Sequence, residues 1–446
     1  MKKVLSHIQN HNLQSLLANG LGAVLGLVSF MLLTRQLGPE QFGHWVLFIT
    51  LVTFSDSLRF GFVLPGTVRS LSSTPKNTST ILGASFTLHL YVLGTIAVVF
   101  TLINLLLFYK EIVLPYGVQL FVQWYPIVAL FNLSNSAGLS LLQARYNYAA
   151  IFRVKLMHTG LFVVFLVGNY WFQLESLRVL LFVYVGCQAL ASLYSFVKRY
   201  DGAQYITKST ILYQKEIATF GKYAMGTLVS NNLLKSADIF IIGLSPVLGI
   251  TAVAIFAIPL KLIELFAIPL NSFGMTAYPK MAALFAENNF GALRKLFYHY
   301  SGIVTLLFVI VAVLCAVIAP QLILILGGTQ FTSHIHELVL LFRIFTIYIV
   351  VLPLDRFTGI MLDALNVPKL NFYKVLLMLL ANVILDVIAV FLLKSIAAVA
   401  IGTIVFTLLG VVIGWVMANK HLSISFKELF KENLELVIKY KKTILA

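Results

Sequence analysis

The sequence is built from apolar stretches of about 20 residues that recur along its whole length, the length that an α-helix needs to cross a lipid bilayer. The first runs from Leu13 to Thr34, the last from Ile396 to Ala418, and there are about twelve in all. Of the 446 residues, 60% are hydrophobic and only 11% are charged, which is far too apolar for a protein that folds in water. We therefore predict an all-α polytopic membrane protein with about twelve transmembrane helices.

The basic residues are distributed unevenly between the two sides of the predicted membrane. If the N-terminus is cytoplasmic and the spans alternate, only Arg35, Lys110, Arg178 and Lys394 fall in external segments. Lysine and arginine accumulate on the cytoplasmic side of membrane proteins, so both termini are predicted to be cytoplasmic. The net charge of +16 then reflects topology, and no nucleic-acid partner is expected.

The chain divides near its middle into two similar halves. The polar segment 201–214 separates two sets of about six spans, and related sequences, Leu141–Ala144 and Met361–Ala364, precede the fifth span of each half. An even number of spans in each half gives the two halves the same orientation, so they form pseudo-symmetric six-helix bundles around a central cavity. We predict an N-terminal lobe at 1–200, a cytoplasmic linker at 201–214, a C-terminal lobe at 215–420 and a cytoplasmic amphipathic tail at 421–446.

Charged residues inside the predicted spans need a reason, because each costs at least about 2.5 to 3.5 kcal/mol near the bilayer centre. If they line a hydrated cavity, the cations can hold an anionic head group and the carboxylates can bind a coupling ion. The candidates for substrate binding are Arg59, Lys235, Lys261, Arg343 and Arg356, and those for ion coupling are Asp238, Glu264 and Asp386. The alternative is structural: Asp56 with Arg59, Lys235 with Asp238, and Lys261 with Glu264 are spaced to form ion pairs within one helix.

Catalytic and metal-binding motifs do not stand out. Cys187 and Cys315 both lie within apolar stretches, so neither a disulfide nor a metal site is predicted. The sequence has no phosphate-binding loop of the P-loop type, which excludes that class of ATP-driven pump. We predict no cofactor and no enzymatic activity, and an ion gradient or the membrane potential as the driving force.

Three segments resemble the polysaccharide flippases, a branch of the multidrug/oligosaccharidyl-lipid/polysaccharide exporter superfamily. They are Leu33–Gly43 (LTRQLGPEQFG), Leu141–Arg145 (LLQAR) and Asp238–Gly243 (DIFIIG). The resemblance implies a transporter of the bacterial or archaeal cytoplasmic (inner) membrane that moves a polyprenyl-diphosphate-linked oligosaccharide to the external leaflet. It also implies polysaccharide-assembly proteins as partners. The resemblance assigns no role to the intramembrane charges, which remain our inference from the residues.

Three functions are compatible with these features. The first is flipping of lipid-linked oligosaccharide by alternating access, for cell-surface polysaccharides such as the O-antigen of lipopolysaccharide. The second is a cation-coupled small-molecule antiporter of the multidrug type, whose cavity should be acidic or aromatic, whereas the predicted one is basic. The third is a membrane-embedded glycosyltransferase or polymerase, which the short external loops argue against.

Overall fold

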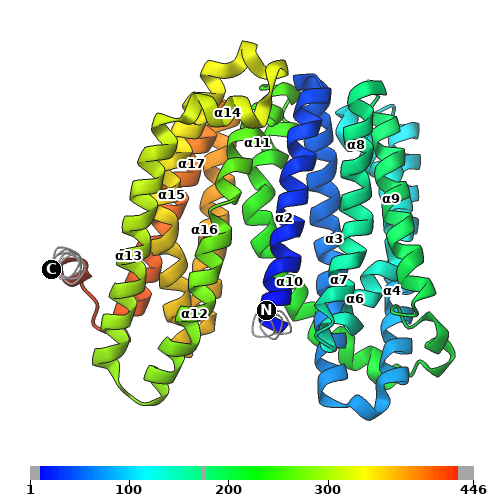
Figure 1. The fold of residues 1–446 in the computed structure, drawn as a ribbon, viewed down its shortest axis with the longest axis horizontal. Coiled ribbons are helices and arrows are strands. Elements are labelled where there is room, and N and C mark those ends of the chain that lie inside the picture. The colour runs from blue at the N-terminus through cyan, green and yellow to red at the C-terminus, as the bar shows by residue number, and fades with distance from the viewer. Residues whose placement is uncertain (1–10, 173–175, 430–446) are drawn as a thin grey trace, which may run out of the picture. The chain divides into compact units, whose positions relative to one another are not determined.

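The computed structural model describes residues 11–172 and 176–429, and every regular element in these residues is a helix (Figure 1). The first half contains α2 (His11–Gln36), α3 (Pro39–Ser73), η1 (Pro75–Asn77), α4 (Thr78–Tyr109), α5 (Tyr116–Phe131), α6 (Leu133–Ala144), α7 (Tyr148–Lys155), the π-helical η2 (Leu156–Gly160), α8 (Leu161–Phe172), α9 (Leu177–Val197) and η3 (Ala203–Lys208). The second half contains α10 (Ile211–Leu244), α11 (Ile250–Glu264), α12 (Ala267–Ala286), α13 (Phe290–Val317), α14 (Ala319–Gly327), η4 (Thr329–His334), α15 (Ile335–Ala364), α16 (Pro368–Val387), the π-helical η5 (Ile388–Leu392) and α17 (Ile396–Asn419).

The helices of the described residues have the length and hydropathy of membrane spans. Nine helical segments meet both criteria, and the bent pair α5 and α6 makes ten. The helices α2, with 26 residues, and α10, with 34, are also long enough to cross, which brings the number to twelve. The prediction of an all-α, multi-pass membrane protein with about twelve membrane helices is confirmed.

The chain forms two compact units. One holds the chain up to Asn232 together with Leu326–Gln330, and the other holds the remainder, so the division falls inside α10. The segment 201–214, predicted as a linker, packs on α4 of the N-terminal unit. Gly83 of α4 makes this packing possible, because any side chain there would collide with the backbone carbonyl of Tyr205.

Prolines lie close to the breaks in two of the long helices. Pro126 in α5 has no N–H to donate to the carbonyl of Val122, and the side-chain amide of Asn104 from α4 bonds to that carbonyl instead at 3.0 Å. The chain then bends by 50° between α5 and α6. In the C-terminal unit, α11 ends at Glu264 and α12 begins at Ala267, between Pro259 and Pro269.

The start of the predicted tail packs on the C-terminal unit. Phe426 stacks on Trp415 of α17 with ring centroids 3.7 Å apart, and the Tyr298 hydroxyl accepts a hydrogen bond from the Ser425 backbone at 2.7 Å. Residues 430–446, which hold most of the predicted amphipathic tail, lie outside the described residues.

Candidate functional site

A stripe of buried residues on α16 organises the polar interior of the C-terminal unit. Lys374, Met378, Asn382 and Asp386 follow each other at intervals of four and therefore share one face of the helix. All four are buried, although three of them are polar. A helix that turns polar groups inward in this way must find partners for them on its neighbours.

At the end of this stripe, side chains from three helices meet. The Asn382 amide donates to Asp238 Oδ1 at 2.8 Å, and the Thr403 hydroxyl of α17 donates to Asp238 Oδ2 at 3.3 Å. Asp238 comes from α10, and all of these groups are buried. The Asn382 amide therefore satisfies one oxygen of Asp238, while the single hydroxyl hydrogen of Thr403 is shared between the other oxygen and the Val399 carbonyl, which also lies 3.3 Å away.

Asp386 is in the opposite situation. No amide, hydroxyl or cationic donor among the described residues bonds to either of its carboxylate oxygens or to the side-chain oxygen of Asn382, and all three atoms are buried. The polar group within hydrogen-bonding reach of Asp386 is the carboxyl of Asp238. Asp386 faces α17, where a Cβ built on Gly402 would lie 3.8 Å from its Oδ1, and its charge interacts with that of Asp238. Two buried carboxylates can stay close only with a proton or a cation between them.

The backbone beyond Asp386 is also irregular. The π-helix η5 begins at Ile388, two residues after Asp386, and interrupts the regular pairing of backbone groups. Such π-helical turns are frequent at functional sites, which agrees with a binding role for this end of α16. We name the group of Asp238, Asn382, Asp386 and Thr403 the C-unit acidic cluster.

A second buried charge in the same unit is fully paired. Lys374 Nζ forms an ion pair with Asp355 Oδ1 at 2.7 Å, and it donates to the Asp355 carbonyl at 2.7 Å and to the Thr358 hydroxyl at 3.1 Å. The distribution of basic residues assigns Lys374 to a cytoplasmic segment, and in the structure its side chain is 2% exposed. No sequence signal places it beside Asp355, because the two residues lie on different helices.

The N-terminal unit has its own buried polar network, but here a basic residue neutralises the acid. Arg59 of α3 donates to Asp56 Oδ1 at 2.8 Å and to the Ala129 carbonyl of α5 at 2.7 Å. Tyr125 and Asn132 donate to the same carboxylate at 3.3 and 3.4 Å. Arg59 is 2% exposed, so this predicted substrate ligand lies in a closed internal ion pair.

The other predicted site residues fall into two groups. Lys235, Arg343 and Arg356 are exposed, and Arg343 Nε donates to the Ala316 carbonyl of α13 at 3.3 Å. Lys261 and Glu264 form an ion pair of 2.7 Å on a partly exposed face of α11. Among the ion-coupling candidates, the structure thus brings Asp238 and Asp386 together, while Glu264 has a basic partner of its own.

Some residues of the acidic cluster could not be selected from the sequence. Thr403 is one of many hydroxyl residues in apolar helices, and only the fold shows that it faces Asp238. The described residues contain no group of three or more histidine, cysteine, aspartate or glutamate side chains arranged for a metal ion. The cluster combines two carboxylates with amide and hydroxyl oxygens, a set suited to a hard cation such as sodium.

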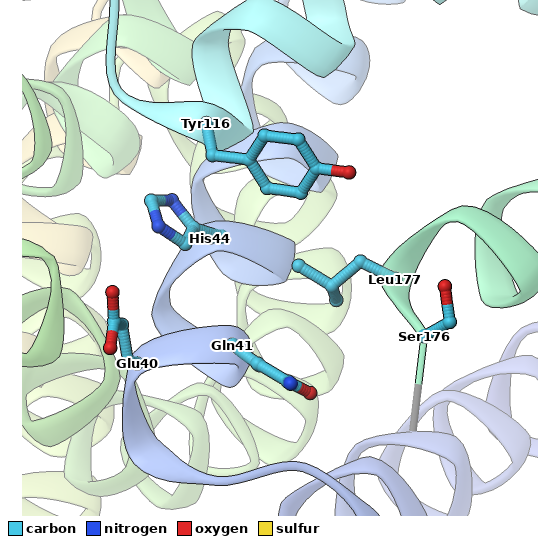
Figure 2. Close-up of a pocket in the computed structure, with 6 residues that line it drawn as sticks. All are labelled: Glu40, Gln41, His44, Tyr116, Ser176 and Leu177. Atoms are coloured by element: carbon cyan, nitrogen blue, oxygen red, sulfur yellow. The ribbon is translucent and has the colours of Figure 1, made fainter. Parts of the chain in front are cut away.

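The N-terminal unit also contains a pocket of about 460 Å³ where α3, α5 and α9 begin. Figure 2 shows the six side chains around it, which are Glu40, Gln41, His44, Tyr116, Ser176 and Leu177. Glu40 and Gln41 belong to the segment Leu33–Gly43 on which the family resemblance rests, and His44 directly follows it.

No model of a known protein family matches this sequence, and no curated protein sequence matches it. Solved structures do match, over nearly the whole chain. An inward-facing multidrug resistance MATE family transporter of the MOP superfamily has a TM-score of 0.72 at 16% identity, covering 92% of this chain and 96% of its own.

Two further structures show the same similarity. A MOP superfamily transporter from Pyrococcus furiosus Vc1, described as having a binding pocket of reverse polarity, has a TM-score of 0.61 at 15% identity over 92% of this chain and 94% of its own. An outward-facing MATE family transporter has a TM-score of 0.59 at 16% identity, again over 92% and 94%. The chain therefore has the fold of the MOP superfamily transporters.

Proposed function

We propose that this chain is a membrane transporter that works by alternating access and exchanges a small-molecule substrate for a cation held in the C-unit acidic cluster. The observation that carries the proposal is the uncompensated carboxylate of Asp386, buried beside Asp238 with no amide, hydroxyl or cationic donor among the described residues. The fold adds support, because it is shared with transporters captured in inward-facing and outward-facing states.

A proton can be shared between Asp386 and Asp238, but sodium can use more of the oxygens of the cluster. A proton on Asp386 satisfies one carboxylate oxygen but leaves the second oxygen and the amide oxygen of Asn382 without a partner. A sodium ion takes several oxygen ligands at once, so it can use all three atoms together with the carboxylate of Asp238. Its charge also offsets the repulsion between the two acids.

Cation binding can drive a conformational cycle because the cluster joins three helices. Asp238 lies on α10, Asp386 on α16 and Thr403 on α17, so an ion between them favours a conformation in which these helices are close. Loss of the ion leaves two unscreened carboxylates and favours separation of the helices. A ligand that binds two conformations with different affinity shifts their populations, which is the requirement for coupled transport.

Flipping of a lipid-linked oligosaccharide is a second candidate. It is favoured by the resemblance of Leu33–Gly43 to the polysaccharide flippases and by the exposed cations Lys235, Arg343 and Arg356 within membrane helices. Such cations can attract a diphosphate, whereas a carrier of cationic drugs needs an acidic or aromatic cavity.

Reconstituted proteoliposomes test both candidates. We expect an inward sodium gradient to drive export of a cationic dye such as ethidium, and Asp386→Asn to stop it. The control is Glu287→Gln, which neutralises an exposed acid at the end of α12 and should leave export unchanged.

The same vesicles, loaded with a fluorescent polyprenyl-diphosphate oligosaccharide, distinguish the substrates. Flipping of this lipid without dye export would support the second candidate. Driving by a proton gradient alone would assign the cluster to protons, and transport that is indifferent to Asp386→Asn would contradict the coupling proposal.

A further inference from the structure

The residues of the segment Leu33–Gly43 have two different roles in the structure. Leu37 and Phe42 are fully buried in the N-terminal unit. Gln36 joins α2 to α8, because its amide donates to the Leu166 carbonyl at 2.6 Å and accepts from Asn169 at 2.8 Å. These residues are explained by packing, but Glu40 and Gln41 are not, because they line the pocket together with His44 (Figure 2).

The walls of this pocket are fixed by contacts behind them. The backbone N–H of Gly117 donates to His44 Nδ1 at 3.1 Å, and any side chain on Gly117 would collide with the His44 carbonyl. The ring of Tyr116 therefore meets that of His44 edge-on, with centroids 5.6 Å apart. On the far side, Arg178 Nε donates to the Tyr116 hydroxyl at 3.2 Å and holds the ring in place.

The pocket offers a mixture of donors and acceptors with few existing partners. The side-chain oxygen of Gln41 is buried and accepts no hydrogen bond from the described residues. Glu40 adds a carboxylate, and Ser176 a hydroxyl. Since His44 Nδ1 accepts from Gly117, a neutral His44 carries its hydrogen on Nε2, where it is a donor. The Tyr116 oxygen accepts from Arg178, which leaves its O–H free to donate.

This set of groups excludes several classes of ligand. The carboxylate of Glu40 repels phosphates and other anions, and Leu177 is the only aliphatic side chain that could hold an apolar molecule. A tightly bound metal ion needs more ligands than one carboxylate and one amide oxygen, because the Nδ1 lone pair of His44 is already used. An organic cation could use Glu40 and the aromatic rings, but it cannot accept hydrogen bonds from the donors on His44 and Tyr116. A neutral polyhydroxylated ligand can use all of these groups, because its hydroxyls both donate and accept while one face packs on the tyrosine ring.

We propose that this pocket is a binding site for a sugar unit, at the end of the N-terminal unit that the charge distribution predicts to be external. Its volume of about 460 Å³ is within the usual range for small-ligand sites. The pocket shares no residue with the C-unit acidic cluster, so the proposal applies to an antiporter as well as to a flippase.

Binding of simple sugars to the purified protein tests the proposal. The probes are the methyl glycosides of glucose, N-acetylglucosamine and rhamnose, followed by saturation-transfer NMR on protein in nanodiscs. We expect saturable binding of at least one of them, weakened about tenfold or more by Gln41→Leu and by Glu40→Gln, since each change removes a hydrogen bond to the ligand.

A matched control locates the binding. Glu111→Gln changes an exposed carboxylate outside the pocket, so it should leave sugar affinity unchanged. Thermal melting of each variant shows whether it folds, and Glu40→Gln keeps the shape of an exposed side chain. The proposal is overturned if folded wild-type protein binds none of the three sugars, if both pocket variants bind as well as wild type, or if calcium binds in their place.

Discussion

Each of the two units buries an aspartate, and the charge of this aspartate has different partners in the two units. In the N-terminal unit, Asp56 is paired with Arg59 on the same helix and accepts further bonds from Tyr125 and Asn132. In the C-terminal unit, Asp386 has only another acid, Asp238, as a charged neighbour. In the first arrangement the charge of the aspartate is neutralised without a ligand, although Arg59 Nε is buried without a hydrogen-bond partner among the described residues. In the second, the charge is neutralised only by a proton or a cation.

The contrast separates structural charges from functional ones. The ion pair of Asp355 with Lys374 joins α15 to α16. The pair of Asp56 with Arg59 lies within α3 and is joined to α5 by the bonds of Arg59 to the Ala129 carbonyl and of Tyr125 to Asp56. A carboxylate without such a partner is expensive in a low-dielectric interior, and this cost is what makes cation binding favourable. Neutralising Asp386 should therefore leave the protein as stable as before or more stable, whereas removing Arg59 or Lys374 should destabilise it.

The largest expected effect is on transport by Asp386→Asn. The amide has the size of the carboxylate but no charge, so we expect the loss of cation-driven transport with unchanged or increased thermal stability. Initial rates in proteoliposomes and the melting temperature of the same preparation measure both. A strongly destabilised variant would place Asp386 among the structural charges.

Arg59→Met should have the opposite effect, because it leaves Asp56 buried without its cation. Removing one member of a buried pair costs about 3 to 5 kcal/mol, which should be seen as a large fall in melting temperature. The double variant Asp56→Asn, Arg59→Met should recover most of the loss. If the double variant is no better than Arg59→Met, the ion pair is not the source of the stability.

Lys374→Met tests whether the loss of stability depends on the partners of the removed charge or on the unit in which that charge lies. Lys374 lies in the C-terminal unit but has a complete set of partners, so its loss should be destabilising, as for Arg59. We expect about 2 to 3 kcal/mol, less than for Arg59, because the Asp355 side chain is 20% exposed and water can reach it. An unchanged melting temperature in Lys374→Met would contradict the distinction between paired and unpaired buried charges.

Glu264→Gln should have the smallest effect. Its ion pair with Lys261 is on a partly exposed face, and such pairs contribute between about zero and 1 kcal/mol. Both melting temperature and cation-driven transport should stay close to wild type. A loss of transport comparable to that of Asp386→Asn would return Glu264 to the coupling site.

The sequence was sufficient for the fold but only partly for the site. Hydrophobic length predicts the spans because the bilayer imposes it on every helix, and the fold of the MOP superfamily transporters agrees with this. Asp238 and Asp386 could be selected because charges inside apolar stretches are conspicuous. That they face each other could not be predicted, since nothing in their local sequence records the packing of α10 against α16 and α17.

The same limit applies to two buried cations. Arg59, a candidate for substrate binding, and Lys374, which the charge distribution assigns to a cytoplasmic segment, are both buried in ion pairs. Arg59 has its acid on its own helix, so the structural alternative could be read from the spacing to Asp56. Lys374 has its acid on α15, and the room for its side chain is provided by Gly414 of α17, where a Cβ would lie 3.3 Å from the lysine Cδ.

Equilibrium binding of radioactive sodium to the purified protein tests the coupling proposal most directly. We predict one saturable sodium site in the wild-type protein, lost in Asp386→Asn and retained in Glu264→Gln and in the double variant Asp56→Asn, Arg59→Met. A wild-type protein that binds no sodium, or an Asp386→Asn variant that binds it as well as wild type, would contradict the assignment of the coupling cation to the C-unit acidic cluster.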